Sequence, residues 1–337
     1  MTKRAKVMWA VIIIAVFTLS GPLVQQAMAK KLVIKFGHGG AASERGGFHN
    51  FAIPFIKIAA DYSNNEIEVR EFPANQLGTE QTLFQKIRLQ DNMMALGAVN
   101  NMAPFAPSVG VFTLPYLFTS TEEVLKLING PFREVLNERI IKESGARVLA
   151  YVTMGFRVLS NSKKPVCTLD ELQGLKIRVP KNPLMIAAYK SWGINPIPMA
   201  WSEVFTALQQ RVIDGQDNPY ISIYANKFYE VQKHITEIHY FQFTGPVAIG
   251  EKFYQSLSPD VQKTLQKAAM DAALVQQKWA AGNRDTAKAG LIKEGMSICV
   301  PEDEEEWIKR ARGTWPKFYD KVGGKQVIDM AIEYMKK

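Results

Sequence analysis

Two arginines stand where a charged side chain could bind a ligand. Arg157 follows an apolar stretch in Gly155-Phe156-Arg157, and Arg178 lies in the segment 174–180, which reads GLKIRVP. A guanidinium presents a planar fork of donors that can hold a carboxylate with two parallel hydrogen bonds. By spacing alone, a surface salt bridge is the more common use of an arginine. Both readings therefore stay open at this point.

A glycine-rich segment is the second candidate. Residues 37–42 follow a short apolar run and fit G-x-G-x-x-A, a pattern that lets a backbone approach a pyrophosphate at a helix N-terminus. However, residues 43–47 continue the loop where the helix should already be running, and Pro54 would interrupt that helix. The favoured reading is a ligand-facing loop at the carboxyl end of the first strand. A secreted enzyme that uses Gly37–Ala42 for a nucleotide cofactor is kept as the alternative function.

Other catalytic patterns do not occur in the sequence. It contains no H-E-x-x-H, no P-loop and no G-x-S-x-G, and its four histidines have no metal-ligand spacing with the cysteines. We can define no nucleophile with a matching base. The sequence therefore predicts a protein that is not an enzyme and uses no cofactor.

The elements that would position these residues alternate between strands and helices. Apolar runs near residues 32–36, 67–69 and 93–99 predict strands, with helical spacing between them up to Tyr62 and over residues 79–90. This β-α-β-α-β order predicts an α/β protein with a mostly parallel sheet covered by helices.

A similar rhythm begins again near residue 148. Residues 148–152 and 175–179 read as strands, Ser202 as the cap of a helix, and the polar segment 214–219 as a loop. Later, Ser258 and Pro259 are good starting residues for a long amphipathic helix, which we expect to reach Ala281.

The N-terminus carries an export signal. Lys3, Arg4 and Lys6 precede a short apolar stretch over residues 7–19, and residues 27–29 read Ala-Met-Ala. This is the pattern of a secretory signal peptide, here with cleavage after Ala29. The apolar stretch is too short to span a bilayer, which needs about 20 residues.

Net charge and cysteine content narrow the possible partners. The 337 residues carry a formal charge of +9, and removing residues 1–29 takes away three positive charges and no negative one, which leaves +6. The remaining charge is mixed in sign along the chain, so no nucleic-acid partner is expected.

Export would permit a disulfide. Since Cys167 and Cys299 lie far apart in the sequence and neither stands in a C-x-x-C, the sequence predicts no bridge between them, and whether they pair stays open.

Several segments together resemble the extracytoplasmic solute-binding proteins of tripartite ATP-independent periplasmic (TRAP) transporters, of the DctP type. They span nearly the whole chain after the signal peptide, in the family's order. These segments are Asn75–Gly78, Phe112–Tyr116, Gly174–Pro180, Pro198–Val204, Asp214–Pro219 and Lys227–Val231.

The resemblance implies a periplasmic binding-protein fold. Two α/β lobes, each a mixed sheet flanked by helices, would join at a hinge, with a long helix crossing both and the ligand in the cleft. We expect lobe I to comprise residues 30–154 and about 244–283. Lobe II would comprise residues 155–243 and about 284–337.

The resemblance also implies a binding site. Arg178 would hold the ligand carboxylate, Arg157 and Asn218 would assist, and Trp201 would line the pocket. The first loop, around His38 and Glu44, and the segment after the third strand would supply further contacts. In that segment the expected residues are Ala98 and Asn101.

Two departures from the family bear on the ligand. Ala98 falls where members that bind sialic acid carry a carboxylate, so sialic acid is not expected. Some members bind a metal through an acidic–aromatic pair. The comparable region here reads Asp217-Asn218-Pro219, so no metal is expected. Trp201 and Ala98 favour a less polar ligand or a monocarboxylate.

The resemblance finally implies a role and partners. A monomer in the periplasm would capture a small organic acid and deliver it to a membrane permease driven by an ion gradient. A receptor subunit that presents its ligand to a sensor would have the same fold, so that role remains a further alternative.

Overall fold

The computed structural model describes residues 31–89 and 91–336, so the predicted signal peptide lies outside the described residues. Apolar runs in the sequence become buried strands, and segments of helical spacing become helices, as expected for an α/β chain. The strands, in chain order, are β1 Leu32–His38, β2 Ile67–Phe72, β3 Met93–Leu96, β4 Ala146–Asn161, β5 Ile177–Val179, β6 Ile197–Pro198, β7 Gly215–Pro219, β8 His234–Thr236, β9 Gln242–Gly250 and β10 Ser297–Cys299.

Helices surround these strands. The α-helices are α1 His49–Tyr62, α2 Glu80–Lys86, α3 Val99–Met102, α4 Thr121–Asn129, α5 Phe132–Ser144, α6 Pro183–Ser191, α7 Trp201–Gln209, α8 Tyr220–Ala225, α9 Glu251–Ser256, α10 Pro259–Lys293, α11 Glu304–Arg312 and α12 Lys325–Lys336. The 3₁₀ helices are η1 Pro107–Thr113, η2 Asp170–Leu172, η3 Phe228–Glu230, η4 Trp315–Phe318 and η5 Asp320–Val322.

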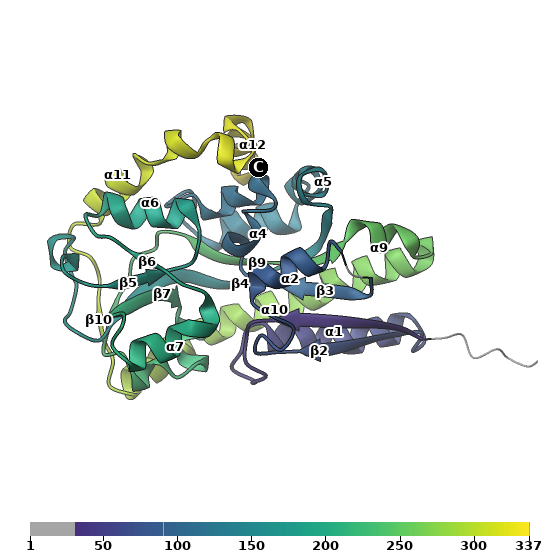
Figure 1. Ribbon diagram of the computed structural model, residues 1–337, viewed down its shortest axis with the longest axis horizontal. Helices are drawn as coiled ribbons and strands as arrows, with labels where there is room; N and C mark the ends of the chain where they lie inside the picture. Colours follow the sequence, from purple (N-terminus) through teal and green to yellow (C-terminus); the bar gives the residue numbers. More distant parts are fainter. Residues whose placement is uncertain (1–30, 90, 337) are drawn as a thin grey trace, which may run out of the picture. The chain divides into compact units, whose positions relative to one another are not determined.

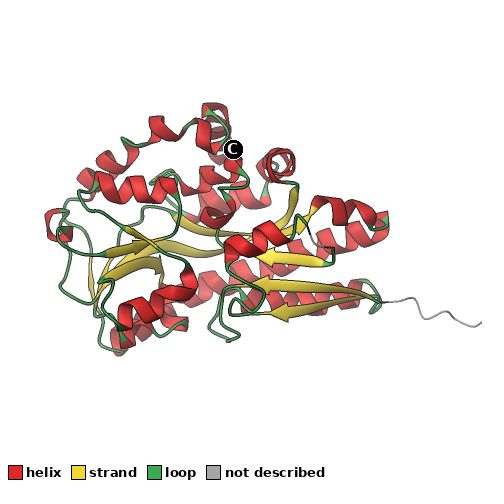
Figure 2. Ribbon diagram, viewed as in Figure 1, coloured by secondary structure: helices red, strands yellow, loops and turns green. Residues whose placement is uncertain are grey.

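The strands of the described residues form one mixed sheet. Its order is β2-β1-β3-β9-β4-β7-β5-β6, and β8 pairs with both β4 and β10. β1 is parallel to β2 and β3, whereas β9 is antiparallel to β3 and β4. Helices lie on both sides of the strands (Figure 2). The architecture is therefore the mixed α/β arrangement that the sequence predicts.

Strand β4 joins the two ends of this sheet. Its first part, Ala146–Phe156, pairs with β9, and its last part, Arg157–Asn161, pairs with β7. Register shifts interrupt the β9 pairing between Val148 and Ala150 and between Thr153 and Gly155. Such irregularities bend a strand and increase its local twist. β4 therefore changes direction just before Arg157.

The long helix α10 is longer than the sequence predicts. It begins as expected, with the Ser258 side chain accepting a hydrogen bond from the Val261 N–H and with Pro259 in the first turn. It ends at Lys293 rather than near Ala281, because buried Ala287 and Leu291 continue its packed face. In Figure 1 this light-green helix runs beneath both ends of the sheet, in contact with α1, β4 and α8.

The polar segment 214–219, expected as a loop, forms the buried strand β7. Its polar side chains find partners on strand β4, which is distant in sequence. Gln216 Nε2 donates to Ser160 Oγ at 2.8 Å, and Asp217 pairs with Arg157. The expected cap at Ser202 is also wrong, since α7 begins at Trp201 and its N-cap residue, Ala200, makes no side-chain bond.

The C-terminal helix α12 packs on the part of the chain expected as lobe I. Its buried Val327 and Ile328 belong to the same hydrophobic cluster as Leu127 and Phe132. The larger hydrophobic cluster joins residues from both expected lobes, such as Phe36 and Leu208. Residues from Lys31 onward accordingly belong to one compact unit.

The structure pairs the two cysteines, which the sequence left open. Cys167 and Cys299 form a disulfide between Cα atoms 5.5 Å apart, across a sequence separation of 132 residues. The parallel pairing of β10 with β8, which also contacts β4, brings Cys299 to this edge of the sheet. The disulfide depends on the pairing of β8 with β10, two strands distant in sequence, so no local sequence pattern could predict it.

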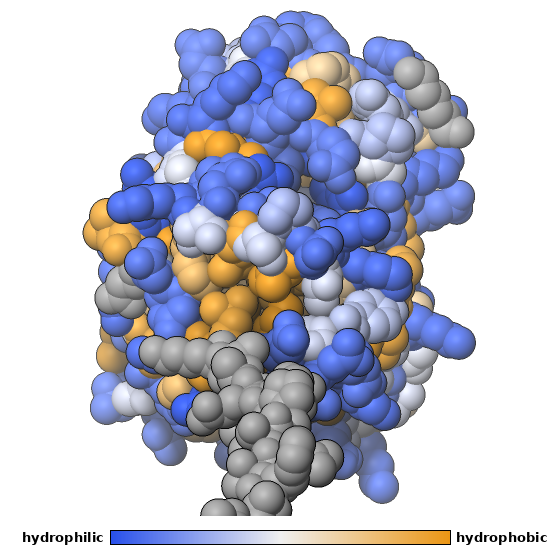
Figure 3. Space-filling model, turned by 90° about the vertical axis from the view of Figure 1, so that its right-hand side faces the viewer, coloured by the Kyte–Doolittle hydropathy of each residue, from blue (hydrophilic) through white to orange (hydrophobic). Residues whose placement is uncertain are grey.

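The surface seen from the side of α1 and α9 is largely hydrophilic, with apolar residues gathered in a limited area (Figure 3). Among the described residues, no helix is long and apolar enough to cross a membrane.

Candidate functional site

One cavity, open to solvent at its mouth, collects most of the predicted site residues. It comprises about 580 Å³ of empty space, its open mouth included. Residues from segments far apart in the sequence line it: Gly40, Ala41, Gly46, Gly47, Phe48, Glu80, Ala98, Asn100, Asn101, Met154, Arg157, Arg178, Pro180, Trp201, Asn218, Ser222, Ala225, Asn226 and Phe243. Arg178, Arg157, Asn218, Trp201, Asn101 and Ala98 are therefore brought together.

Strand β5 carries Arg178 into the cavity. The side chain is only 2% exposed, and its Nε and Nη2 both donate to the Met199 carbonyl, at 3.0 and 2.7 Å. Within residues 31–89 and 91–336, Arg178 forms no ion pair and its Nη1 has no hydrogen-bond partner. Burial, together with the neighbouring charge of Arg157, lowers the pKa of Arg178 to about 10. This guanidinium is a buried cation that lacks an anion in contact.

Arg157, on β4, is in a different situation. Its Nε donates to Asp217 Oδ2 at 2.5 Å, its Nη1 to Asn218 Oδ1 at 3.0 Å, and its Nη2 to the Asp217 carbonyl. Burial acts to lower the pKa of Arg157, but the Asp217 carboxylate outweighs it and the pKa lies above its ordinary value. Tyr240 also donates to Asp217. Arg157 is thus held by the protein itself.

Asn218 and Trp201 complete this side of the cavity. Asn218 is 5% exposed; besides accepting from Arg157, it donates from Nδ2 to Gln216 Oε1 at 2.5 Å. Trp201, at the start of α7, stacks on Phe228 with ring centroids 5.4 Å apart. Both side chains are therefore fixed before any ligand arrives.

The glycines of the first loop let its backbone approach the cavity. A Cβ atom on Gly47 would lie only 2.2 Å from the Met154 sulfur, so a side chain there would displace Met154. Gly37 and His38 belong to β1, and α1 begins only at His49. The tight strand-to-helix turn of a dinucleotide site is thus missing from this segment.

The structure does not place His38 or Glu44 in the lining of this cavity. His38 is fully buried, its Nε2 lies 2.8 Å from Glu71 Oε1, and its ring contacts the lining residue Phe48 edge-on. The same carboxylate oxygen is 2.8 Å from His49 Nδ1. Glu44 is exposed to solvent. Both residues support or flank the loop.

Four polar lining residues were missed from the sequence: Glu80, Asn100, Ser222 and Asn226. Glu80, at the N-terminus of α2, accepts through Oε2 from the Ala98 N–H at 2.8 Å and from Asn101 Nδ2 at 2.7 Å. Burial raises the pKa of Glu80, although these bonds and the charge of Arg178 act against it. Asn100 is 1% exposed. Glu80 was missed because an acidic residue in the first turn of a helix is normally explained as a helix-start signal. Asn100 was missed although it directly precedes the predicted Asn101.

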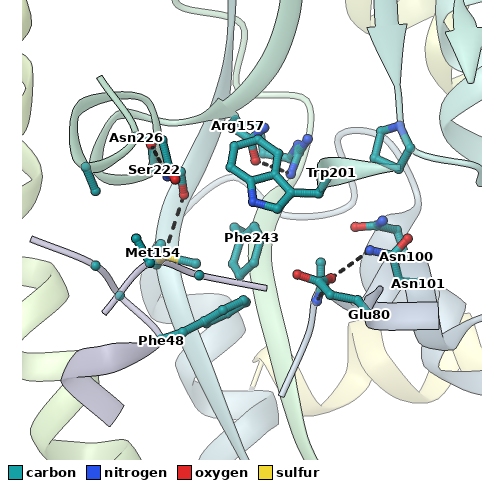
Figure 4. Close-up of a pocket in the computed structure, with 18 of the residues that line it drawn as sticks. Phe48, Glu80, Asn100, Asn101, Met154, Arg157, Trp201, Ser222, Asn226 and Phe243 are labelled. Atoms are coloured by element: carbon teal, nitrogen blue, oxygen red, sulfur yellow. Dashed lines mark hydrogen bonds between the residues drawn. The ribbon is translucent and has the colours of Figure 1, made fainter. Parts of the chain in front are cut away.

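The lining combines polar and apolar side chains. Figure 4 shows Glu80, Asn100 and Asn101 together on one side, with Phe48, Met154 and Phe243 on another. Among the described residues, no group of His, Cys, Asp and Glu is arranged to hold a metal ion. The cavity offers an unpaired guanidinium, amides, one carboxylate and an apolar wall, which together suit a small anion.

Comparison with known proteins assigns this mixed α/β chain to a class of binding proteins. Residues 38–322 match the family model of bacterial extracellular solute-binding proteins, family 7 (DctP). The chain belongs to this family.

Similar proteins carry names of the same kind. The 2,3-diketo-L-gulonate-binding periplasmic protein of Escherichia coli K12 is 30% identical over 89% of this chain and 87% of its own length. A TRAP periplasmic solute-binding protein from Rhodobacter sphaeroides, solved in an open apo form, is 42% identical, with a TM-score of 0.76 over 90% of this chain and 98% of that one. A TRAP solute-binding protein from Haemophilus influenzae, solved with bound L-gulonate, is 31% identical, with a TM-score of 0.83 over 90% and 99% of the two chains.

Proposed function

We propose that this protein captures a small organic acid by its carboxylate and delivers it to the membrane permease of a TRAP transporter. The observation that carries the proposal is Arg178, a buried guanidinium that lines the cavity without an acidic partner among the described residues. A buried charge is unfavourable unless it is paired, and a carboxylate would supply the missing partner. The L-gulonate of the Haemophilus influenzae protein and the 2,3-diketo-L-gulonate of the Escherichia coli relative both carry such a group.

The other predicted residues take supporting roles in this proposal. Arg157 and Asn218, fixed by Asp217 and Gln216, assist at the carboxylate end, and Trp201 covers it. Ala98 and Asn101 contact the rest of the ligand, whereas His38 supports Phe48 from behind the loop. Glu44 flanks the mouth of the cavity without a direct role.

Ligand binding would involve movement of two lobes. We assign residues 31–154 and about 244–283 to lobe I, as expected from the sequence. We add residues from about 313 to the end of helix α12, because Phe318, Val322 and Val327 belong to the same hydrophobic cluster as Leu127 and Phe132. Residues 155–243 and about 284–312 form lobe II. The hydrogen bond from Asn182 Nδ2 to the Asn100 carbonyl, at 3.2 Å, is among those that cross this division, and it would break on opening.

Export precedes this role. Cleavage of a signal peptide after Ala29 would release a protein of 308 residues into the periplasm, where it acts as a monomer and does not bind nucleic acid. Mass spectrometry of the exported protein should find Lys30 as its first residue, and an intact N-terminus would contradict the cleavage.

A thermal-shift screen with organic acids tests the function. A ligand at one hundred times its Kd stabilises the native state by about 2.7 kcal/mol, so a true ligand raises Tm clearly. Arg178→Lys is the control, because it keeps a positive charge but loses the planar fork, and its shift should be much smaller. If no carboxylate shifts the wild-type protein, the proposal is contradicted.

A further inference from the structure

Asn100 is a buried amide with no partner for its side chain. It is 1% exposed, and neither Nδ2 nor Oδ1 forms a hydrogen bond within the part of the chain that the structure describes. Its main chain lies in helix α3, and its carbonyl accepts from Asn182 Nδ2 at 3.2 Å. Buried polar groups are nearly always paired, so a buried amide without a partner that lines a ligand cavity points to a group on the ligand.

Glu80 adds an acceptor on the same side of the cavity (Figure 4). Its Oε2 already receives two hydrogen bonds, from the Ala98 N–H and from Asn101, whereas Oε1 receives none from the described residues. The Glu80 carboxylate is therefore held in place through one oxygen, and the other remains able to accept a hydrogen bond.

These two side chains select among chemical groups. An amide needs both a donor and an acceptor, and a hydroxyl supplies both, whereas a methylene supplies neither. A second carboxylate would offer acceptors only and would bring a negative charge towards Glu80. An ammonium group would suit Glu80 but would offer Asn100 Nδ2 no acceptor.

We propose that the ligand is a hydroxylated monocarboxylate, whose carboxylate meets Arg178 and whose hydroxyl groups are recognised by Asn100 and Glu80. The inference rests on the proposed function and names its ligand class. The C–H groups of such a chain would pack on Phe48 and Phe243. The sequence favours a less polar ligand or a monocarboxylate. The present proposal keeps the monocarboxylate and replaces the less polar ligand with a hydroxylated one.

Isothermal titration with matched six-carbon acids tests the ligand class. The probes are L-gulonate, D-gluconate and D-galactonate as hydroxylated acids, hexanoate without hydroxyls, 6-aminohexanoate and adipate. Sites built to bond a hydroxyl strongly reject analogues that lack it. At least one hydroxylated acid should therefore bind roughly ten-fold or more tightly than hexanoate, 6-aminohexanoate and adipate.

The variant Asn100→Leu tests the residue. It should weaken the tightest hydroxylated acid by roughly ten-fold or more, while binding of hexanoate changes by less than about two-fold. Asn129→Leu, which alters an asparagine outside the cavity lining, is the matched control and should change neither. Thermal unfolding without ligand verifies that each variant is folded. If Asn100→Leu does not fold, Asn100→Ala replaces it, since it also removes both polar side-chain atoms without adding a charge and should also lose the preference.

Each outcome decides a different claim. Tighter binding of hexanoate, 6-aminohexanoate or adipate than of all three hydroxylated acids would overturn the ligand class while leaving an organic-acid binder. An equal effect of Asn100→Leu on every acid, or no effect on any, would remove Asn100 from recognition. Binding of none of the six acids would contradict this inference, and the wider thermal-shift screen would then show whether the proposed function fails with it.

Discussion

Arg157 and Arg178 line the same cavity, but within the described residues only Arg157 is paired with an acid. Asp217 lies 2.5 Å from Arg157 Nε, whereas the Nε and Nη2 of Arg178 both meet the uncharged Met199 carbonyl. Removing Arg157 would leave the buried Asp217 carboxylate without a compensating charge, which is strongly destabilising. Arg178 has no such partner in the described part of the chain, so its removal leaves no buried charge uncompensated. The two arginines should therefore respond to substitution in opposite ways.

Replacing Arg178 should affect binding more than folding. Arg178→Lys keeps a charge but cannot form two parallel hydrogen bonds with a carboxylate. A charged hydrogen bond contributes about 1.5–3 kcal/mol, so the Kd for the tightest acid found by screening should rise roughly ten- to hundred-fold. Calorimetry measures the Kd, and urea unfolding should show an unchanged stability. An unchanged Kd would remove Arg178 from the site.

Replacing Arg157 should affect folding first. Arg157→Met leaves Asp217, which is 0% exposed, without its cation, and the free energy of unfolding should fall by about 3–5 kcal/mol. Urea denaturation at neutral pH measures this loss. The double variant Arg157→Met with Asp217→Leu removes both charges and should recover part of it. A loss below about 1 kcal/mol in the single variant would show that the pair is not structural.

The disulfide should contribute substantially to stability. Cys167 and Cys299 close a loop across a sequence separation of 132 residues, for which the loss of chain entropy in the unfolded state corresponds to about 5 kcal/mol. The variant with serine at both positions should unfold at lower denaturant by up to that amount. A reducing agent should destabilise the wild-type protein but not the serine variant, and equal responses would contradict the bridge.

Glu80 should make stability depend on pH. Its pKa is raised from the ordinary value of 4.5 in the folded protein, first by burial. The cost of its charge is therefore fully present above the raised pKa, falls as pH drops through it, and is gone below about 4.5. Glu80→Gln keeps an acceptor for Ala98 and Asn101, so it should stabilise the ligand-free protein at neutral pH.

Urea denaturation at several pH values measures the difference in free energy of unfolding between Glu80→Gln and the wild-type protein. The advantage of Glu80→Gln over the wild-type protein should shrink as pH falls towards 4.5. A variant that is less stable at neutral pH, or a difference that does not change with pH, would show that the Glu80 charge is compensated in the fold.

Local sequence patterns were sufficient for much of the fold. The apolar runs predicted β1, β2 and β3, and Ser258 with Pro259 located the start of α10, because burial and capping depend on neighbouring residues. The end of α10 was missed because Ala287 and Leu291 are held by packing against distant elements rather than by local pattern.

Sequence by itself determined the family, through six short segments that follow the family's order, and it identified Arg178. Only the tertiary structure decided what each residue does there. Asp217 became the partner of Arg157 because β7 pairs with β4, and Cys167 met Cys299 because β10 pairs with β8. Asn100 and Glu80 entered the cavity because α2 and α3 lie beside each other. Charge pairing and burial depend on groups far apart in the chain, so no local spacing could reveal which arginine is free.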